Sequence, residues 1–224
     1  LSYSMQMDFE EHPPITVAGT TGYHPCFYRN DIVLDGKLDE WRNQPAIDLK
    51  ADGNRVSAFP GGMDRAGSFG GKVWIAWNRE NFYLAAEIDD PVHVQIFPVW
   101  QGDSLQFGLA RAIPASADTK VEFEAAFNAE GTGWIFPAGP PGFDADTLRK
   151  YSRLRMKQEG PRSIYELEIP WKHLRFIRPQ DGVFRFSLLA NNNDGERRLG
   201  YLEWGSGIGR TKDPANYPVC VFVK

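Results

Sequence analysis

The sequence lacks the long apolar runs that cross membranes, since no part of its 224 residues approaches the roughly 18 consecutive apolar residues of a span. It has no excess of positive charge either, because 25 Lys and Arg stand against 29 Asp and Glu, a net charge of −4. Without a basic stripe along the chain, we expect neither a membrane span nor nucleic acid as a partner. The four His residues are scattered and form no cluster with zinc-site spacing.

Only two cysteines are present, Cys26 and Cys220, each in a strand-like segment near one end of the chain. Terminal strands of a β-sandwich often lie side by side, so a disulfide between these residues is one of two alternatives. The bridge would close a loop of nearly the whole chain and stabilise the fold by about 5 kcal/mol on the loop-entropy model. The other alternative is a pair of buried free thiols, and spacing alone does not decide between them.

Aromatic residues, glycine and proline are abundant instead. An aromatic content of 13%, with 22 Gly and 16 Pro, favours short strands joined by long loops, and a hydrophobic content of 42% suffices for a full core. Residues 1–22 are polar and contain prolines, which predicts an N-terminal arm. The rest of the chain, residues 23–224, shows no repeat and no boundary, so we expect one domain and a monomer.

Alternation of apolar and polar residues marks the strands. In Ser104–Leu109 every second residue is apolar, so Leu105, Phe107 and Leu109 face one way. The same reasoning predicts about ten strands. They include 23–28, 72–77, 82–88, 104–109, 120–127, 132–136, 148–157, 163–169, 183–190, 199–204 and 219–223. Residues 50–71 are predicted to be a long loop. The fold class is therefore all-β: a single antiparallel β-sandwich of the immunoglobulin or jelly-roll type, with two sheets and long loops.

Several segments, taken together and in order, resemble family 9 carbohydrate-binding modules and the wider DOMON-like β-sandwich superfamily. They are Ile32–Trp41, Trp77–Pro91, Trp100–Phe107, Tyr165–Trp171 and Trp204–Val223. The resemblance implies two antiparallel sheets packed face to face and non-catalytic binding of sugars, often at chain ends, between two Trp rings. It also implies structural calcium in some members. Together with the disulfide alternative, it places the protein outside the cytoplasm: extracellular, periplasmic or at the cell surface.

The resemblance carries over to individual residues only in part. Trp100 falls on the first Trp of the sugar clamp, in a matching Trp-x-x-Asp-Ser context, and Asp90 matches an acidic position before a proline. Gln106 stands where a Glu is expected, and Glu124 roughly where an Arg is expected. Thr211 occupies the position of the second Trp. Arg210, Lys212, Trp204 and Trp134 are alternative substitutes for that Trp, which the resemblance itself does not assign. The candidate sugar-binding residues are Trp100, Asp90, Gln106, Glu124, Arg210, Thr211 and Trp204.

The resemblance and the sugar chemistry together predict non-catalytic binding of a cello-type, xylo-type or other plant-type glycan by aromatic stacking and polar contacts. An alternative is a DOMON-type electron-transfer module with haem b held by Met63 and His93. A further alternative is an accessory or structural domain of a glycan-active enzyme. Glu122 and Glu124 lie on one strand face, roughly 7 Å apart by strand rise, but alternating Glu is typical of a solvated face, so glycosidase activity is not expected.

Carboxylates in turns offer a further kind of site. Oxygen ligands of the kind that calcium takes are present at Asp35 and Asp39, which we select as candidate metal ligands. No segment follows an EF-hand pattern, and Asp is also an ordinary turn residue. The only cofactor that the sequence suggests is therefore a structural Ca²⁺.

Overall fold

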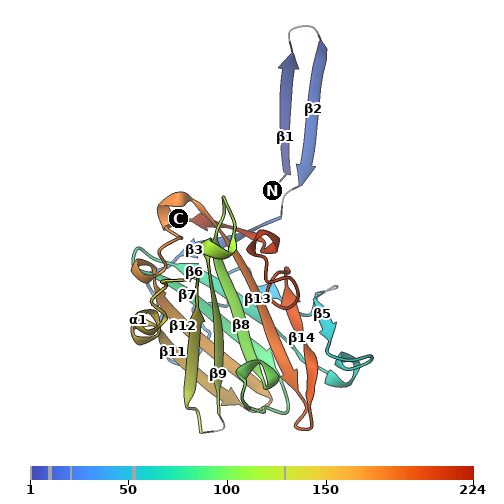
Figure 1. Ribbon diagram of the computed structural model, residues 1–224, viewed down its shortest axis with the longest axis vertical. Helices are drawn as coiled ribbons and strands as arrows, with labels where there is room; N and C mark the ends of the chain where they lie inside the picture. The colour runs from blue at the N-terminus through green and yellow to red at the C-terminus, as the bar shows by residue number, and fades with distance from the viewer. Residues whose placement is uncertain (1, 10–11, 21, 52–53, 129) are drawn as a thin grey trace.

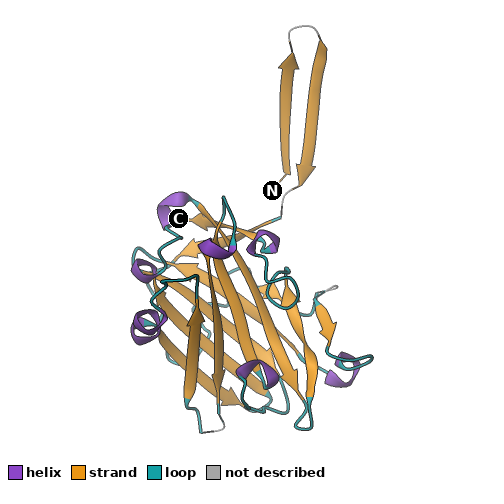
Figure 2. Cartoon of the chain, viewed as in Figure 1, coloured by secondary structure: helices purple, strands orange, loops and turns teal. Residues whose placement is uncertain are grey.

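The computed structural model describes residues 2–9, 12–20, 22–51, 54–128 and 130–224. Strands make up most of this part of the chain and the helices are short, as Figure 2 shows. Strands β1 (Ser2–Phe9) and β2 (His12–Thr20) pair with each other in a 2-stranded antiparallel sheet. Figure 1 draws this hairpin projecting from the body of the molecule, in the segment where the sequence predicts an arm.

A 13-stranded sheet forms the body, and it curls so that its two halves face each other. One half contains β10 (Gly133–Ala138), β9 (Lys120–Phe127), β8 (Ser104–Arg111), β13 (Val183–Asn193), β14 (Arg198–Trp204) and β5 (Arg55–Ser57). The other half contains β3 (Tyr23–Tyr28), β6 (Gly70–Trp77), β7 (Asn81–Asp89), β12 (Arg162–Pro170), β11 (Arg153–Glu159) and the short β4 (Ile47–Asp48). Strand β15 (Val219–Val223) joins the halves by pairing with both β13 and β3.

This architecture confirms an all-β fold but corrects the prediction of one antiparallel sandwich with two separate sheets. At the seam, β15 runs parallel to β3, and β3 runs parallel to β6. The pairing through β15 makes the two halves one continuous sheet, so neither half is a separate layer. The strands also exceed the predicted number because β1, β2 and β5 lie in segments expected to be arm or loop, and the two-residue β4 lies in a segment without a predicted strand.

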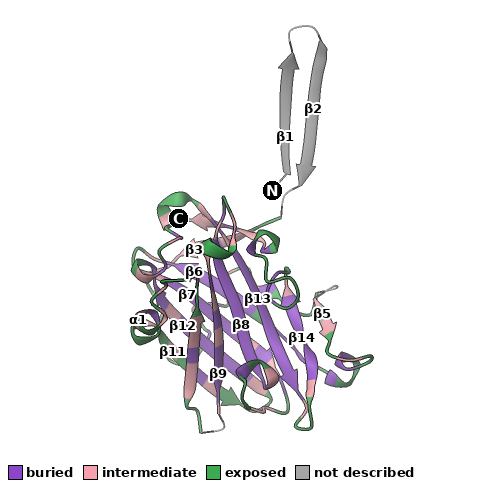
Figure 3. Cartoon of the chain, viewed as in Figure 1, coloured by how far each residue is buried: buried purple, intermediate pink, exposed green. Residues whose placement is uncertain are grey.

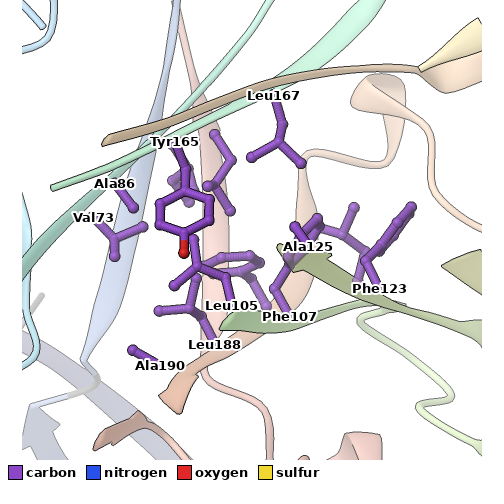
Figure 4. Packing of buried hydrophobic residues seen from close by; sticks show 14 of the residues in the cluster. Val73, Ala86, Leu105, Phe107, Phe123, Ala125, Tyr165, Leu167, Leu188 and Ala190 are labelled. Carbon is purple, nitrogen blue, oxygen red and sulfur yellow. The ribbon is translucent and has the colours of Figure 1, made fainter. Parts of the chain in front are cut away.

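The core lies between the two halves, where alternate residues of each strand point inward. Tyr165 and Ala86 from one half face Leu105 and Leu188 from the other, as Figure 4 shows. Strands β8 and β13 are buried over most of their length in Figure 3, because loops cover their outer faces as well. Large aromatic side chains fill this core, and two of them, Phe107 and Phe123, stack with ring centroids 4.6 Å apart.

The outer faces of both halves are covered by loops. On the β6–β7–β12 side, fully buried Trp41 packs against Trp74 and Tyr83. Glu166, also fully buried, fixes this loop by accepting hydrogen bonds from the Gly36 N–H (2.6 Å) and the Trp41 Nε1–H (3.4 Å). Glu166 is therefore a structural acceptor here, and not the solvated carboxylate that alternation along the strand indicates.

Helical segments are few, and one of them corrects a strand prediction. Residues 148–157 are predicted to be extended, but helix α1 occupies Ala145–Tyr151 before β11 begins. The side chain of Asp144 accepts a hydrogen bond from the Thr147 N–H and so caps the helix, which local alternation does not reveal. The 3₁₀ helices are η1 (Met63–Ala66), η2 (Val99–Gln101), η3 (Ala117–Thr119), η4 (Trp171–His173), η5 (Pro179–Asp181) and η6 (Pro214–Asn216).

The two cysteines lie on neighbouring strands, as expected, but as free thiols. Cys26 on β3 and Cys220 on β15 are both fully buried, and no bridge joins them. The register pairs Cys220 with His24, and Cys26 with Phe222, so the two thiols lie out of step along the parallel pair. The structure therefore contains the pair of buried free thiols and not the disulfide. None of the helices in the described ranges has the length and apolar character that a membrane crossing needs.

Candidate functional site

A groove lies on the outer face of β9, β8, β13 and β14, where the covering loop leaves the sheet open. It consists of two adjoining hollows of about 320 and 280 Å³ that share Gln106, Glu124, Ile208 and Lys212. The residues that line only the first are Trp100, Leu189, Arg198, Tyr201 and Gly209. Those that line only the second are Glu122, Phe123, Phe136, Pro137 and Ala138. The groove thus combines aromatic, apolar and charged side chains from separate parts of the chain.

Trp100 stands at one end of the groove on the short helix η2. Its side chain is 38% exposed, so a large part of the indole is open to a ligand. The Arg198 guanidinium lies over its ring, 5.3 Å from the centroid, and also over the ring of Tyr201 at 5.1 Å. Two hydrogen bonds from Arg198 to Asn191 Oδ1, of 3.2 and 2.7 Å, hold the guanidinium in place. This arrangement fixes Trp100 and presents a cation beside it.

Gln106 and Glu124 form the polar floor of the groove. They are direct partners in the β8–β9 register, so their side chains lie next to each other on the outer face. Neither side chain makes a hydrogen bond within the described part of the chain. Loss of hydration raises the pKa of Glu124, with Lys212 opposing the shift and Glu122 adding to it. Both side chains therefore offer unused hydrogen-bonding groups to a ligand.

The far wall is the loop between β14 and β15, and buried contacts fix its position. Glu203 Oε1 accepts hydrogen bonds from the N–H groups of Ile208 and Gly209, both 3.0 Å long. The Tyr217 hydroxyl donates to Glu122 Oε1 at 2.9 Å, and its ring lies over Gly108. The wall is thus attached to the sheet at several points and presents Lys212 to the groove.

The structure brings three of the predicted sugar-binding residues together: Trp100, Gln106 and Glu124 all line the first hollow. Arg210 and Thr211 are exposed on the same wall but line neither hollow. Arg210 lies close enough to Tyr201 for its charge to act on the Tyr201 hydroxyl, whereas Thr211 Oγ1 accepts a hydrogen bond from Asn216 Nδ2 at 3.1 Å. These contacts give both residues a role in the shape of the wall.

Asp90 and Trp204 lie elsewhere, so their predicted place among the sugar-binding groups has to be corrected. Asp90 is only 2% exposed and lies beside Asp103 at the end of the core. Trp204 is partly buried on the inner face, with its ring 5.5 Å from that of His24 and 6.0 Å from that of Phe186. Burial between the sheet halves keeps both side chains out of the groove.

Asp35 and Asp39, the predicted metal ligands, are not part of a metal-binding group among the described residues. Both are exposed, and each lies near a cation instead, with Lys37 Nζ 3.8 Å from Asp35 and an Arg42 nitrogen 3.9 Å from Asp39. The described residues that could hold an ion together are Asp90, His93 and Asp103. A structural Ca²⁺ at Asp35 and Asp39 stays a prediction.

Sequence reasoning missed Arg198 and Tyr201 as groove residues. Arg198 follows a polar turn and reads as an ordinary surface charge, and Tyr201 reads as a core residue of its strand. The signal that could have found Tyr201 is the face of β14, because Tyr201 lies opposite in phase to the inward-facing Leu202 and Trp204. Alternation does not find Arg198, because the pairing of β14 with β13 is irregular between Gly200 and Arg198. Lys212, two positions after Arg210, lines both hollows.

Comparison with known proteins places this fold in a class of binding modules: it is the fold of family 9 carbohydrate-binding modules. A Caldicellulosiruptor kristjanssonii module of this family, solved with cellotriose, superposes with a TM-score of 0.68 at 17% identity over 90% of this chain and 94% of that one. The same module with glucose gives 0.67 at 17% identity, over 90% and 95%. A proposed carbohydrate-binding protein from Bacteroides uniformis gives 0.58 at 12% identity, over 90% and 100%. No family model and no curated protein matches the sequence.

Proposed function

We propose that the protein binds a carbohydrate, without catalysis, in the groove beside Trp100. The observation that carries the proposal is the combination of an exposed indole with the unpaired polar groups of Gln106 and Glu124 and the charged Arg198. Sugar rings have apolar C–H faces and hydroxyl edges, so they need an aromatic surface with hydrogen-bonding groups around it. The solved modules with this fold, one with cellotriose and one with glucose, favour a cello-type ligand.

The expected affinity follows from these contacts. Covering roughly 100 Å² of the Trp100 ring contributes about 2–3 kcal/mol. Each hydrogen bond to Gln106, Glu124 or Arg198 adds about 1 kcal/mol. Several kcal/mol are lost on association, so a dissociation constant of order 1 mM is expected for a short oligosaccharide. Because Thr211 stands where a second Trp would complete a clamp, we infer that the ligand stacks on one ring only.

Catalysis is not part of the proposal, because the two carboxylates of the groove are not equivalent. Glu122 receives hydrogen bonds from Lys120 Nζ (2.8 Å) and the Tyr217 hydroxyl (2.9 Å), and Lys212 Nζ lies 3.5 Å away. A carboxylate held by two cations and a phenol is a poor general base or nucleophile. Glu124 alone cannot supply both groups that glycoside hydrolysis needs.

The haem alternative finds little support in the geometry. Met63 is fully buried and its backbone N–H is bound by Ser57 Oγ. His93 stacks on Phe127, with ring centroids 4.3 Å apart, and its Nε2 lies 2.9 Å from the Phe127 carbonyl oxygen. Neither residue lines the groove. We infer from the likeness to carbohydrate-binding modules that the protein acts outside the cytoplasm. We also propose that it is a monomer.

The test is a titration of the protein with cello-, xylo- and manno-oligosaccharides and with the free monosaccharides. Binding is measured by calorimetry and by Trp fluorescence. We expect saturable binding of one sugar class and no release of reducing sugar during the incubation. Saturable binding that Glu124→Gln and Gln106→Ala both weaken would support the groove as the site. Absence of binding to every glycan by a folded sample would refute the proposal.

A further inference from the structure

Three potential metal ligands converge at one end of the core, away from the groove floor. They are Asp90 after β7, Asp103 before β8, and His93 in the connection between these strands. One ligand atom from each lies within 4.8 Å of the other two. Ligands of a zinc ion lie about 2.0–2.2 Å from the metal, and so about 3–4 Å from one another. Small side-chain shifts therefore suffice to place all three on one ion.

The hydrogen bonds of His93 leave one ring nitrogen suited to metal binding. Nε2 lies 2.9 Å from the Phe127 carbonyl oxygen, which can only accept, so Nε2 carries the proton. Nδ1 then carries a lone pair. Its neighbour, Ser163 Oγ at 3.3 Å, has a better acceptor for its hydrogen in Gln158 Oε1 at 2.7 Å. A histidine whose second nitrogen donates to a backbone carbonyl is the usual arrangement at a metal centre.

The two carboxyl groups lie side by side without a basic partner. Asp90 and Asp103 are 2% and 3% exposed, and they contact each other. Backbone N–H groups of Val94 and Asn193 donate to Asp103, but no Lys or Arg in the described part of the chain pairs with either carboxylate. Two buried carboxylates in contact need a shared proton or a bound cation.

A fourth, unpartnered oxygen belongs to the same end of the core. Asn192 is 4% exposed, and its Oδ1 has no hydrogen-bond partner. Its neighbour Asn191 pairs with Ser104, and the N–H of Asn193 donates to Asp103 Oδ1, so Asn192 lies between two residues that contact this end of β8. On β13, Asn192 is in phase with the inward-facing Ala190. A buried amide oxygen without a donor, next to two buried carboxylates, points independently to a missing cation.

We propose that Asp90, His93 and Asp103 bind one divalent transition-metal ion, with Asn192 Oδ1 as a fourth ligand. Mixed imidazole and carboxylate ligands suit Zn²⁺ or Mn²⁺, whereas Ca²⁺ and Mg²⁺ take oxygen ligands. The ion neutralises the buried carboxylates and ties the 90–103 connection to β13. This connection carries η2 and hence Trp100. Metal binding at the site does not require a glycan, so it can be tested separately from the proposed function.

The test uses the full chain without a histidine tag, stripped with a chelator and dialysed. Calorimetric titrations with ZnCl₂, MnCl₂, CaCl₂ and MgCl₂ at neutral pH give stoichiometry and affinity, and thermal unfolding gives the shift in Tm. The ligand variants are Asp90→Asn, Asp103→Asn and His93→Gln. The matched control is Asp89→Asn, which changes the adjacent carboxylate, whose Oδ2 pairs instead with Lys50 Nζ at 2.9 Å.

We expect one equivalent of Zn²⁺ or Mn²⁺, a Tm that rises with metal concentration, and weaker binding of Ca²⁺ and Mg²⁺. Loss of a residue that only hydrogen-bonds a metal ligand costs about 10–100-fold in metal affinity, so loss of Asp103, a direct ligand, should cost roughly 100-fold or more. Asp89→Asn should leave the affinity unchanged. No uptake by the wild type, or uptake unaltered in both Asp90→Asn and Asp103→Asn, would overturn the site. Preference for Ca²⁺, or full affinity in His93→Gln, would overturn the choice of metal. The Asn variants remove a buried repulsion and should fold. If one of them does not fold, metal uptake by the other decides whether the site exists.

Discussion

The substitution Trp100→Ala tests the proposed groove most directly. With 38% of its surface exposed, and roughly 250 Å² in the whole side chain, Trp100 offers about 90 Å² to a ligand. At about 25 cal/mol per Å², covering this area contributes about 2 kcal/mol, so its loss should weaken glycan binding about 30-fold. The fold should tolerate the change because Trp100 lies on a short exposed helix and not in the core.

The assay is calorimetric titration of wild type and variant with the best oligosaccharide ligand, at the same temperature and salt concentration. Phe97→Ala is the matched control, since Phe97 is 64% exposed on the same connection but lines neither hollow. Trp100→Phe should lose less affinity than Trp100→Ala because it keeps part of the ring. A Trp100→Ala variant that folds and binds as tightly as wild type would show that stacking in this groove is not how the protein recognises its ligand.

Three further changes have defined outcomes. Glu124→Gln should weaken glycan binding about tenfold at pH 7.5 by removing a charged acceptor, while sugar release by wild type and not by the variant would reveal an enzyme. Gly108→Ala places a Cβ 2.5 Å from the Tyr217 ring and should cost about 1–3 kcal/mol in urea unfolding; an unchanged midpoint would contradict the packing. Burial raises the pKa of Glu166 to about 7 from its usual 4.5, so the folded chain holds an extra proton between these values. Stability should then fall by on the order of 2 kcal/mol as pH rises from 5 to 8, and Glu166→Gln should flatten that fall in urea midpoints.

Much of the fold follows from alternation along the strands. The apolar residues of β8 and β9 recur at every second position, which predicts both the strands and the face that packs in the core. The same pattern cannot show which strands pair across the seam. The parallel pairing of β15 with β3 joins segments almost 200 residues apart in the sequence, and no local signal in 219–223 specifies a direction.

The site is less predictable because it gathers residues that are far apart in the sequence. Trp100, Gln106 and Glu124 could be chosen from motif and strand face, and they do lie together. Arg198 could not, because its position over Trp100 depends on a hydrogen-bonded contact with Asn191 across the β13–β14 turn. Asp90 illustrates the opposite error: an acidic residue beside a candidate loop reads as a surface group, yet tertiary packing buries it.

The contrast between the two Trp residues explains what decides a functional position in this fold. Trp204 and Tyr201 belong to the same strand three positions apart, so they point to opposite faces: Trp204 packs inward against Phe186, and Tyr201 lines the groove. Strand alternation does not determine the direction of Trp100, because this residue precedes β8 on the 3₁₀ helix η2. Aromatic residue type therefore carries little information on its own here. Strand phase separates core from groove, whereas Trp100, which lies outside the strands, combines a large apolar surface with exposure.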